Sequence, residues 1–198
     1  KKIVITGGLG YIGTELCKIY SGYSWNDKIT VIDNRFISER VNQIRNWNME
    51  FIHGDILDKE LINKHFKNAD VVHHLAGITS VPRTKSESSR EQDEKIKLVA
   101  EEGTQNILNA ISNECKLIFP STHVVYEGIS EVRKDIKEDE STQPVLSYSL
   151  SKSNAMDFIF VVTSWFPTNK TALIRSIPKA LNCAVVRLDA LFKCRSLS

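Results

Sequence analysis

Thr-Gly-Gly-Leu-Gly-Tyr-Ile-Gly, at residues 6–13, directly follows the apolar run of residues 3–5. An apolar strand that turns through glycines into a helix is typical of a turn that binds a pyrophosphate. Gly7 permits the tight turn, Gly10 leaves room for the phosphates, and Gly13 lets the helix pack closely. The helix N-terminus adds free N–H groups and the positive end of the helix dipole. The stretch therefore predicts a dinucleotide site at the start of the chain.

The residues after the glycine turn fit the same site. Apolar side chains recur at helical spacing after the turn, and a second apolar run, residues 29–32, ends in Asp33. Asp33 lies about twenty positions past Gly13, which is the spacing of a carboxylate that binds the adenosine ribose. The alternative is a plain strand, turn and helix in which Asp33 only caps a loop.

Composition and charge narrow the class of protein. The 198 residues suffice for one full core, and a net charge of +2 gives no electrostatic reason to expect nucleic acid or a membrane surface as a partner. No apolar stretch approaches the ~20 residues of a membrane span, and no signal-peptide pattern opens the chain. The four scattered cysteines lack a CxxC spacing, which indicates reduced thiols in a cytoplasmic protein, with Cys17 and Cys115 in the core.

Short β-rich runs alternate with helical stretches, which predicts parallel βαβ units. Several of the runs are almost wholly apolar, as expected when helices cover both faces of a sheet. The fold class is therefore expected to be α/β, a Rossmann-type doubly wound parallel sheet with helices on both faces. The polar segments 79–90 and 127–147 are expected to form loops. The expected strands are 2–6, 29–33, 50–53, 70–74, 116–120 and 184–188, and the expected helices are 11–21, 58–67, 91–113 and 148–162.

The clearest chemical signal is Tyr148-Ser-Leu-Ser-Lys152, because residues four apart share one face of a helix. A lysine ammonium beside a phenol favours the phenolate and lowers the tyrosine pKa from its ordinary value of about 10. Such a tyrosine can exchange a proton with a sugar or alcohol hydroxyl. Ser121 and Thr122 follow the strand expected at 116–120 and supply a hydroxyl donor. The alternative is a pair on the helix surface that makes a minor contact.

Two further segments are expected at the edge of the same site. In Gly54-Asp55-Ile56, Asp55 can accept from an adenine amino group and Ile56 can lie against the ring, although Gly-Asp also marks plain turns. Small residues in His74-Leu75-Ala76-Gly77 would let a cofactor lie across the strand ends. We expect no metal at the pair His73 and His74, because neighbouring strand residues point to opposite faces.

Together these motifs resemble the extended short-chain dehydrogenases/reductases of the NAD-dependent epimerase/dehydratase family. The resemblance runs from residue 2 to about residue 155, in the order expected for that family. The matching residues are the pattern Thr6, Gly7, Gly10 and Gly13, the acid Asp33, the segments 54–56 and 74–77, Thr122 ahead of Val125-Tyr126, and the pair Tyr148 and Lys152.

By that resemblance, Tyr148 is the acid/base, Thr122 hydrogen-bonds the substrate oxygen, and Lys152 holds the nicotinamide ribose and tunes Tyr148. The implied reaction is transient hydride transfer from a carbon of a nucleotide sugar to NAD. Asp33 favours NAD over NADP, because a carboxylate repels a 2′-phosphate, although nearby Arg35 works against this preference. The expected cofactor contacts are Gly7, Gly10, Tyr11, Ile12, Gly13, Asp33, Asn34, Asp55, Ile56, Leu75, Ala76, Gly77, Ser121, Tyr148 and Lys152.

The chain departs from the family pattern at three places. Ala100 replaces the usual Asn of the long helix. His123 and Val124 stand where sugar-nucleotide 4,6-dehydratases carry Asp-Glu, which favours an epimerase or a reductase. Residues 160–198 are atypical and are expected to begin an incomplete substrate region. We therefore expect residues 1–198 to be a single NAD(P)-binding Rossmann domain, truncated so that the substrate domain is largely missing.

Three functions remain open on the sequence alone. The first is a sugar-nucleotide epimerase-like oxidoreductase, and the second is an NAD-dependent reductase or dehydrogenase that acts on another substrate. The third is an NAD-binding fragment without turnover. Members of the family often dimerise through helices that correspond to 91–113 and 148–162, so a homodimer is a further expectation from the resemblance.

Overall fold

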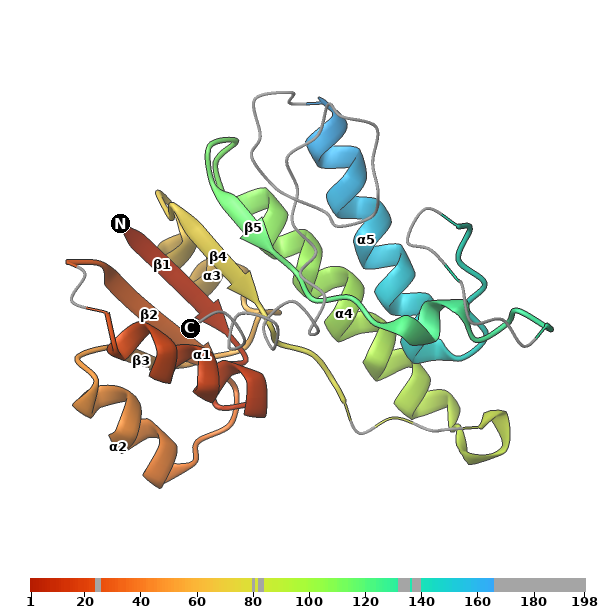
Figure 1. Cartoon of the computed structure of the whole chain (residues 1–198), viewed down its shortest axis with the longest axis horizontal. Coiled ribbons are helices and arrows are strands. Elements are labelled where there is room, and N and C mark those ends of the chain that lie inside the picture. Colours follow the sequence, from red (N-terminus) through yellow and green to blue (C-terminus); the bar gives the residue numbers. More distant parts are fainter. Residues whose placement is uncertain (24–25, 80, 82–83, 132–135, 137–139, 166–198) are drawn as a thin grey trace, which may run out of the picture.

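A five-stranded parallel sheet forms the centre of the computed structural model (Figure 1), which describes residues 1–23, 26–79, 81, 84–131, 136 and 140–165. The strands are β1 (Lys2–Thr6), β2 (Lys28–Asp33), β3 (Glu50–His53), β4 (Val71–His74) and β5 (Lys116–Ile118). Their order is β3-β2-β1-β4-β5, so the chain reverses its direction across the sheet between β3 and β4. The carboxyl ends of β1 and β4 are therefore neighbours at a topological switch point, where doubly wound sheets bind ligands.

Helices cover both faces of the sheet, as the apolar strands predict. Ile3 and Ile5 pack into a core with α1 (Tyr11–Ser21) and α2 (Ser38–Asn46). Val4, which points the other way, packs into a second core with three further helices. These are α3 (Lys59–Phe66), α4 (Arg90–Ala110) and α5 (Ser147–Trp165), and two short 3₁₀ turns complete the described elements, η1 (Lys85–Glu87) and η2 (His123–Tyr126). The Rossmann-type fold class is thus confirmed.

Most predicted elements start or end close to their expected positions, but two predictions were wrong. Helix α2 was not expected, because only Val41 and Ile44 of its nine residues are buried and its apolar period is too short to recognise. Strand β5 ends at Ile118 rather than at residue 120, because Pro120 has no N–H to donate to a neighbouring strand. The strand expected at 184–188 lies outside the described residues.

Helix α4 continues through Gly103, a residue that weakens the sequence prediction of a helix there. The Ile56 side chain packs so closely against Gly103 that any Cβ would collide with it. The glycine therefore serves a close contact between α4 and the segment after β3, which offsets its low helix propensity. Cys17 and Cys115 are buried free thiols, as predicted.

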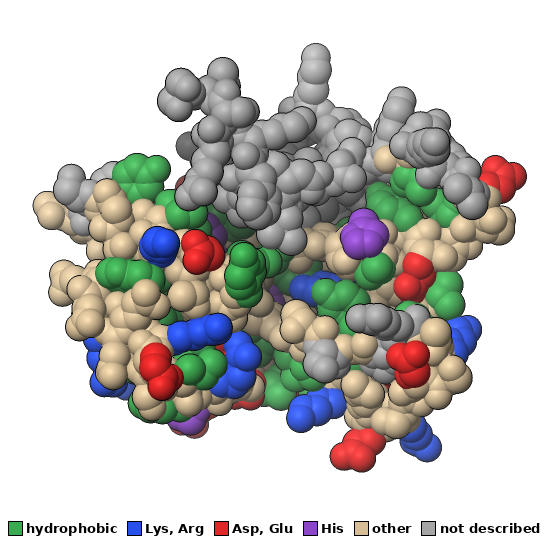
Figure 2. Space-filling model, turned by 60° about the horizontal axis from the view of Figure 1, so that its bottom comes forward, with side chains coloured by type: hydrophobic (Ala, Val, Ile, Leu, Met, Phe, Trp, Pro, Cys, Tyr) green, Lys and Arg blue, Asp and Glu red, His purple; other side chains and the backbone are tan. Residues whose placement is uncertain are grey.

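Charged side chains of both signs lie on the surface. Figure 2 shows basic and acidic side chains interspersed over one face, in keeping with the small net charge of +2. No helix in the described part of the chain is long and apolar enough to cross a membrane.

Candidate active site

The glycine turn between β1 and α1 closes onto the end of β4. Gly7 has a backbone φ of +67°, a left-handed conformation that side chains rarely adopt. A Cβ on Gly7 would also lie 2.7 Å from the backbone nitrogen of Ala76. Gly10 donates its N–H to the Gly7 carbonyl at 3.0 Å, and a Cβ on Gly13 would collide with the same carbonyl. The tight turn predicted at Gly7 is confirmed, and the close neighbour of Gly13 is the turn rather than the sheet.

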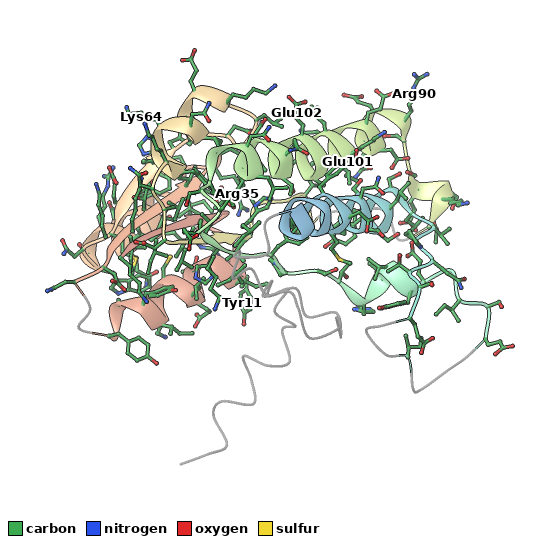
Figure 3. The ribbon with its side chains drawn as sticks, turned by 90° about the horizontal axis from the view of Figure 1, so that it is seen from above. Tyr11, Arg35, Lys64, Arg90, Glu101 and Glu102 are labelled. Atoms are coloured by element: carbon green, nitrogen blue, oxygen red, sulfur yellow. The ribbon has the colours of Figure 1, made fainter. Side chains whose placement is uncertain are left out.

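Asp33, at the end of β2, holds the glycine turn from one side. Its side chain is only 4% exposed. Oδ2 accepts the Leu9 N–H at 2.9 Å, and Oδ1 accepts the Arg35 N–H at 3.0 Å. The Arg35 guanidinium, which is exposed, places its Nε 3.5 Å from Oδ1 (Figure 3). The predicted ribose-binding carboxylate therefore lies beside the turn, with part of its charge compensated by Arg35.

The segment after β3 reaches the same end of the sheet. Asn34 donates its Nδ2–H to Asp55 Oδ2 at 2.9 Å, and Asp55 Oδ1 accepts the Leu57 N–H at 2.9 Å. Asp55 therefore lies beside β2, where an adenine contact was predicted. Ile56 is only 5% exposed because it packs against α4, so its predicted contact with an adenine ring stays a prediction.

A directional chain of hydrogen bonds joins β4 to β1 and α4 through the fully buried His74. The Thr104 hydroxyl donates to the Ala100 carbonyl at 2.5 Å, so its oxygen can only accept from His74 Nε2, at 3.1 Å. His74 Nδ1 then accepts from the Thr6 hydroxyl at 3.0 Å, whose oxygen accepts the Ala76 N–H at 3.1 Å. These hydrogen bonds require a neutral His74 imidazole with its proton on Nε2. Burial, with a smaller contribution from Lys152, lowers the pKa of His74 to about 3.

His73 points to the opposite face of the sheet from His74. Its Nε2 lies 2.8 Å from the Tyr20 hydroxyl of α1, and burial lowers its pKa to about 4. The two imidazoles therefore lie on opposite faces of the sheet, His73 against α1 and His74 against α4, as the strand geometry predicts. Among the described residues, no group of three or more His, Cys, Asp or Glu side chains is arranged to hold a metal ion.

The predicted hydroxyl donors lie in the segment that connects β5 with η2. Thr122 caps η2, and its Oγ1 accepts the Val124 N–H at 3.4 Å. Ser121 donates its hydroxyl to the Met156 thioether of α5 at 2.6 Å. The Ser121 hydroxyl is thus directed at the α5 core in this structure, whereas its contact with a cofactor stays a prediction.

Lys152 of α5 extends to the carboxyl ends of β4 and β5. Its Nζ lies 4.4 Å above the Phe119 ring centroid and 3.5 Å from the Pro120 carbonyl oxygen, to which it donates. A Cβ on Gly77 would lie 3.9 Å from the same Nζ, with nothing else within 4 Å. Burial lowers the pKa of Lys152 to about 8. The structure therefore brings together Lys152 and the Gly77 strand end, as the sequence predicts.

Tyr148 lies in the first turn of α5 and is half-buried, one helical turn before Lys152. Burial raises its pKa above the ordinary value, so the lowered pKa expected from the sequence is wrong for this structure. The reason is geometric, because the Lys152 ammonium lies against Phe119 and Pro120, and burial of the phenol decides the direction of the shift.

The predicted residues divide into two groups. The glycine turn, Asp33 and Asp55 form the first, at the ends of β1, β2 and β3. In the second, Lys152 reaches the ends of β4 and β5, whereas the approach of Thr122 and Tyr148 to one substrate stays a prediction. The exposed Tyr11 (Figure 3), the half-buried Ile12, and Leu75 and Ala76 lie around the first group. Sequence patterns placed Thr6 in the glycine motif but did not reveal its hydrogen bond to His74. They did not reveal Thr104 or Phe119, whose roles depend on strands and helices that meet only in three dimensions.

A surface hollow of about 630 Å³ lies elsewhere, between α3, α4 and α5, and no predicted site residue lines it. Lys59, Glu102 and Phe158 are among its lining residues. Glu101, on the same stretch of α4 (Figure 3), accepts from Asn154 Nδ2 of α5 at 2.7 Å. This hollow is therefore separate from the edge of the sheet that carries the candidate chemistry.

The doubly wound sheet with a glycine turn at its switch point agrees with the resemblance to the extended short-chain dehydrogenases/reductases. The sequence profile of the 3-beta hydroxysteroid dehydrogenase/isomerase family matches residues 4–176. The chain belongs to this family, and the resemblance stated from the sequence is confirmed.

Curated relatives and solved structures agree with this class. The chain is 30% identical to a dTDP-D-glucose 4,6-dehydratase of Dictyostelium discoideum over 88% of its own length and 42% of the relative. It is 32% identical to a UDP-glucose 4-epimerase of Mycoplasma genitalium, over 76% of this chain and 45% of that one. A UDP-glucuronic acid 4-epimerase from Bacillus cereus, solved in complex with NAD, superposes with a TM-score of 0.67 at 26% identity, covering 84% of this chain and 53% of the other. The chain thus spans about half the length of the proteins it matches.

Proposed function

We propose that this chain is the NAD-binding part of an enzyme that epimerises a nucleotide sugar by transient hydride transfer. The observation that carries the proposal is the position of Lys152, whose ammonium lies beside Gly77 at the switch point, with Tyr148 one helical turn away. The names of the relatives, among them UDP-glucose 4-epimerases, support a nucleotide sugar as the substrate class. A sugar hydroxyl bound near Tyr148 would be the group whose proton is exchanged.

NAD fits the edge of the sheet that the glycine turn forms. The turn leaves no side chain at Gly10, and the buried carboxylate of Asp33 lies beside it. Similar structures are solved with NAD, which supports this cofactor over NADP. When bound, NAD supplies a hydride acceptor that later returns the hydride. The chain's own residues would bind the cofactor and orient it, with Lys152 donating to the nicotinamide ribose.

The proton would be carried by Tyr148, with Thr122 orienting the sugar oxygen. Since burial holds the pKa of Tyr148 high, the phenol is neutral near pH 7 in the chain alone. Acting as a base requires a nearby positive charge that favours the phenolate. Lys152 carries such a charge only below its pKa of about 8. We therefore expect the phenolate to form only once ligands rearrange the charges around Tyr148.

The test is turnover of UDP-glucose in the presence of NAD, measured by chromatography of the UDP-galactose that forms. Replacing Tyr148→Phe should lower the rate by about 100-fold or more, because the acid/base group is lost. Tyr23→Phe is the matched control, since Tyr23 is an exposed tyrosine after α1. Equal rates for wild type and Tyr148→Phe would reject the role of Tyr148.

One observation favours a second candidate, a dehydrogenase that oxidises an alcohol such as a hydroxysteroid. The matching family is named for a 3-beta hydroxysteroid dehydrogenase/isomerase. Such an enzyme would release reduced cofactor steadily with a 3-beta hydroxysteroid, whereas an epimerase would return the hydride to its substrate. Binding of NAD without either reaction would instead favour an NAD-binding fragment without turnover.

A further inference from the structure

One carboxylate joins the two segments that carry the proposed acid/base residues. Thr122 precedes η2, and Glu127 follows it directly. Glu127 Oε1 accepts the N–H groups of Val145, at 2.9 Å, and Leu146, at 2.7 Å, and also the Ser149 hydroxyl. Leu146 and Ser149 lie on either side of the start of α5, so this single oxygen spans the turn that contains Tyr148.

The backbone brings the same two segments together. Gln143 donates its N–H to the Val125 carbonyl at 2.8 Å, and Gly128 donates its N–H to the Gln143 carbonyl at 2.8 Å. Residues 125–128 therefore run against the segment that leads into α5. The side chain of Glu127 extends this pairing from the backbone of residues 125–128 to Ser149 in the first turn of α5.

The chemistry of Glu127 suits this place. The first N–H groups of a helix lack partners within the helix, and a carboxylate near that end is favoured by the helix dipole. Burial disfavours the ionised carboxyl, but the three hydrogen bonds outweigh burial and hold the pKa of Glu127 below its usual value. The group is therefore a charged acceptor at neutral pH.

The rest of α5 is anchored differently. Ala155, Met156 and Ile159 are buried in the core beneath the sheet and hold the body of the helix. Its first turn lies outside this apolar cluster, so local hydrogen bonds add to the packing of the half-buried Tyr148. Glu127 supplies three of these, and it lies five residues from Thr122 in the chain.

We propose that Glu127 is a positioning residue that fixes the first turn of α5 against η2 and thereby sets Tyr148 relative to Thr122. The catalytic part of this inference rests on the proposed function, whereas the structural part does not. Glu127 touches neither the glycine turn nor Asp33, so its removal should act on Tyr148 and leave the dinucleotide end of the site unchanged.

The experiment compares three variants of the full chain with wild type. Glu127→Ala removes the acceptor, and Glu127→Gln keeps a neutral oxygen acceptor of the same length. Glu131→Ala removes an exposed carboxylate four residues further along the chain and is the matched control. NAD titration of each variant shows whether the fold and the dinucleotide end remain intact.

Two readouts report on α5 without any substrate. With ¹³C-labelled tyrosine, the Tyr148 ring resonance is assigned by its loss in Tyr148→Phe, and its shift is followed by NMR. The amide exchange rate of Leu146 reports its hydrogen bond to Glu127 at 2.7 Å, beside a longer contact of the same N–H with the Ser149 hydroxyl at 3.2 Å. Glu127→Ala should move the Tyr148 resonance and speed exchange at Leu146 by about tenfold, which is the size of a lost helix cap. Glu127→Gln should restore part of both, and Glu131→Ala should change neither.

The outcomes separate the inference from the proposed function. If Glu127→Ala leaves the Tyr148 resonance and the Leu146 exchange at wild-type values, the positioning role is overturned, whatever the turnover. If these readouts move but Tyr148→Phe does not affect turnover, the structural role stands and the proposed function fails. Where turnover is measurable, Glu127→Ala should lower kcat by about tenfold at unchanged KM for NAD, because only the placement of Tyr148 is lost.

Discussion

At the scale of single residues, the shape of the glycine turn depends on positions where a side chain would collide with the backbone. Gly7 combines a left-handed backbone with an approach to Ala76 that excludes a Cβ. The sequence revealed this position because the glycine spacing has a direct steric reason. It did not reveal the hydrogen bonds of Thr6 and Thr104 to His74, because a threonine that hydrogen-bonds a buried histidine leaves no local pattern.

The residue Gly7 gives a sharp prediction for stability. Gly7→Ala should lower the free energy of unfolding by about 1–3 kcal/mol, since it forces a side chain into the left-handed region and against β4. Gly22→Ala is the control, because Gly22 has an ordinary φ of −77° and a Cβ there would lie 3.4 Å from the Ile19 carbonyl oxygen. We expect that change to stay within about 0.5 kcal/mol. Denaturant unfolding measures both, and equal effects would contradict the account of the turn.

At the scale of elements, α5 brings charged and polar groups to the ends of β4 and β5. The sequence predicted this helix and the pairing of Tyr148 with Lys152 along it, because a four-residue spacing is a property of any helix. It mispredicted the pKa of Tyr148, since the direction depends on where the Lys152 ammonium points and how deeply the phenol is buried. Helix α2 escaped detection for a related reason, because its two buried residues are too few to show a period.

The partly buried Lys152 is expected to lower the stability of the fold while serving the proposed function. Its pKa falls from an ordinary 10.5 to about 8, which corresponds to a cost of about 3 kcal/mol at neutral pH. Lys152→Met removes this cost, but it also removes the contact of the ammonium with the Phe119 ring, which contributes about 1–2 kcal/mol. We therefore expect this variant to be about 1–2 kcal/mol more stable than wild type at pH 7, and inactive.

The stability difference between Lys152→Met and wild type should depend on pH. Between about pH 8 and 10.5 the unfolded chain keeps the Lys152 proton and the folded chain has lost it, so the wild type gains stability as pH rises. The advantage of Lys152→Met should shrink across that window. Lys64→Met, at an exposed lysine of α3 (Figure 3), should show no such trend. If the unfolding free energies of Lys152→Met and wild type differ by the same amount from pH 7 to 10, the lowered pKa of Lys152 is contradicted.

At the scale of the whole molecule, the strand order decides where chemistry can occur. The reversal between β3 and β4 leaves the ends of β1 and β4 side by side, and the glycine turn and the Lys152 ammonium lie near these ends. The sequence predicted the parallel α/β class because its apolar runs alternate with helices. It could not predict that Glu127 would connect the end of η2 with the start of α5, because that contact joins residues eighteen or more positions apart in the chain.

The most direct test of the central claim is a calorimetric titration of the purified chain with NAD, with NADP as the comparison. The account predicts clear binding of NAD and weaker binding of NADP, because the buried Asp33 carboxylate lies beside the turn and repels a 2′-phosphate. Binding of neither nucleotide, or tighter binding of NADP through Arg35, would contradict the assignment of this edge of the sheet as an NAD site.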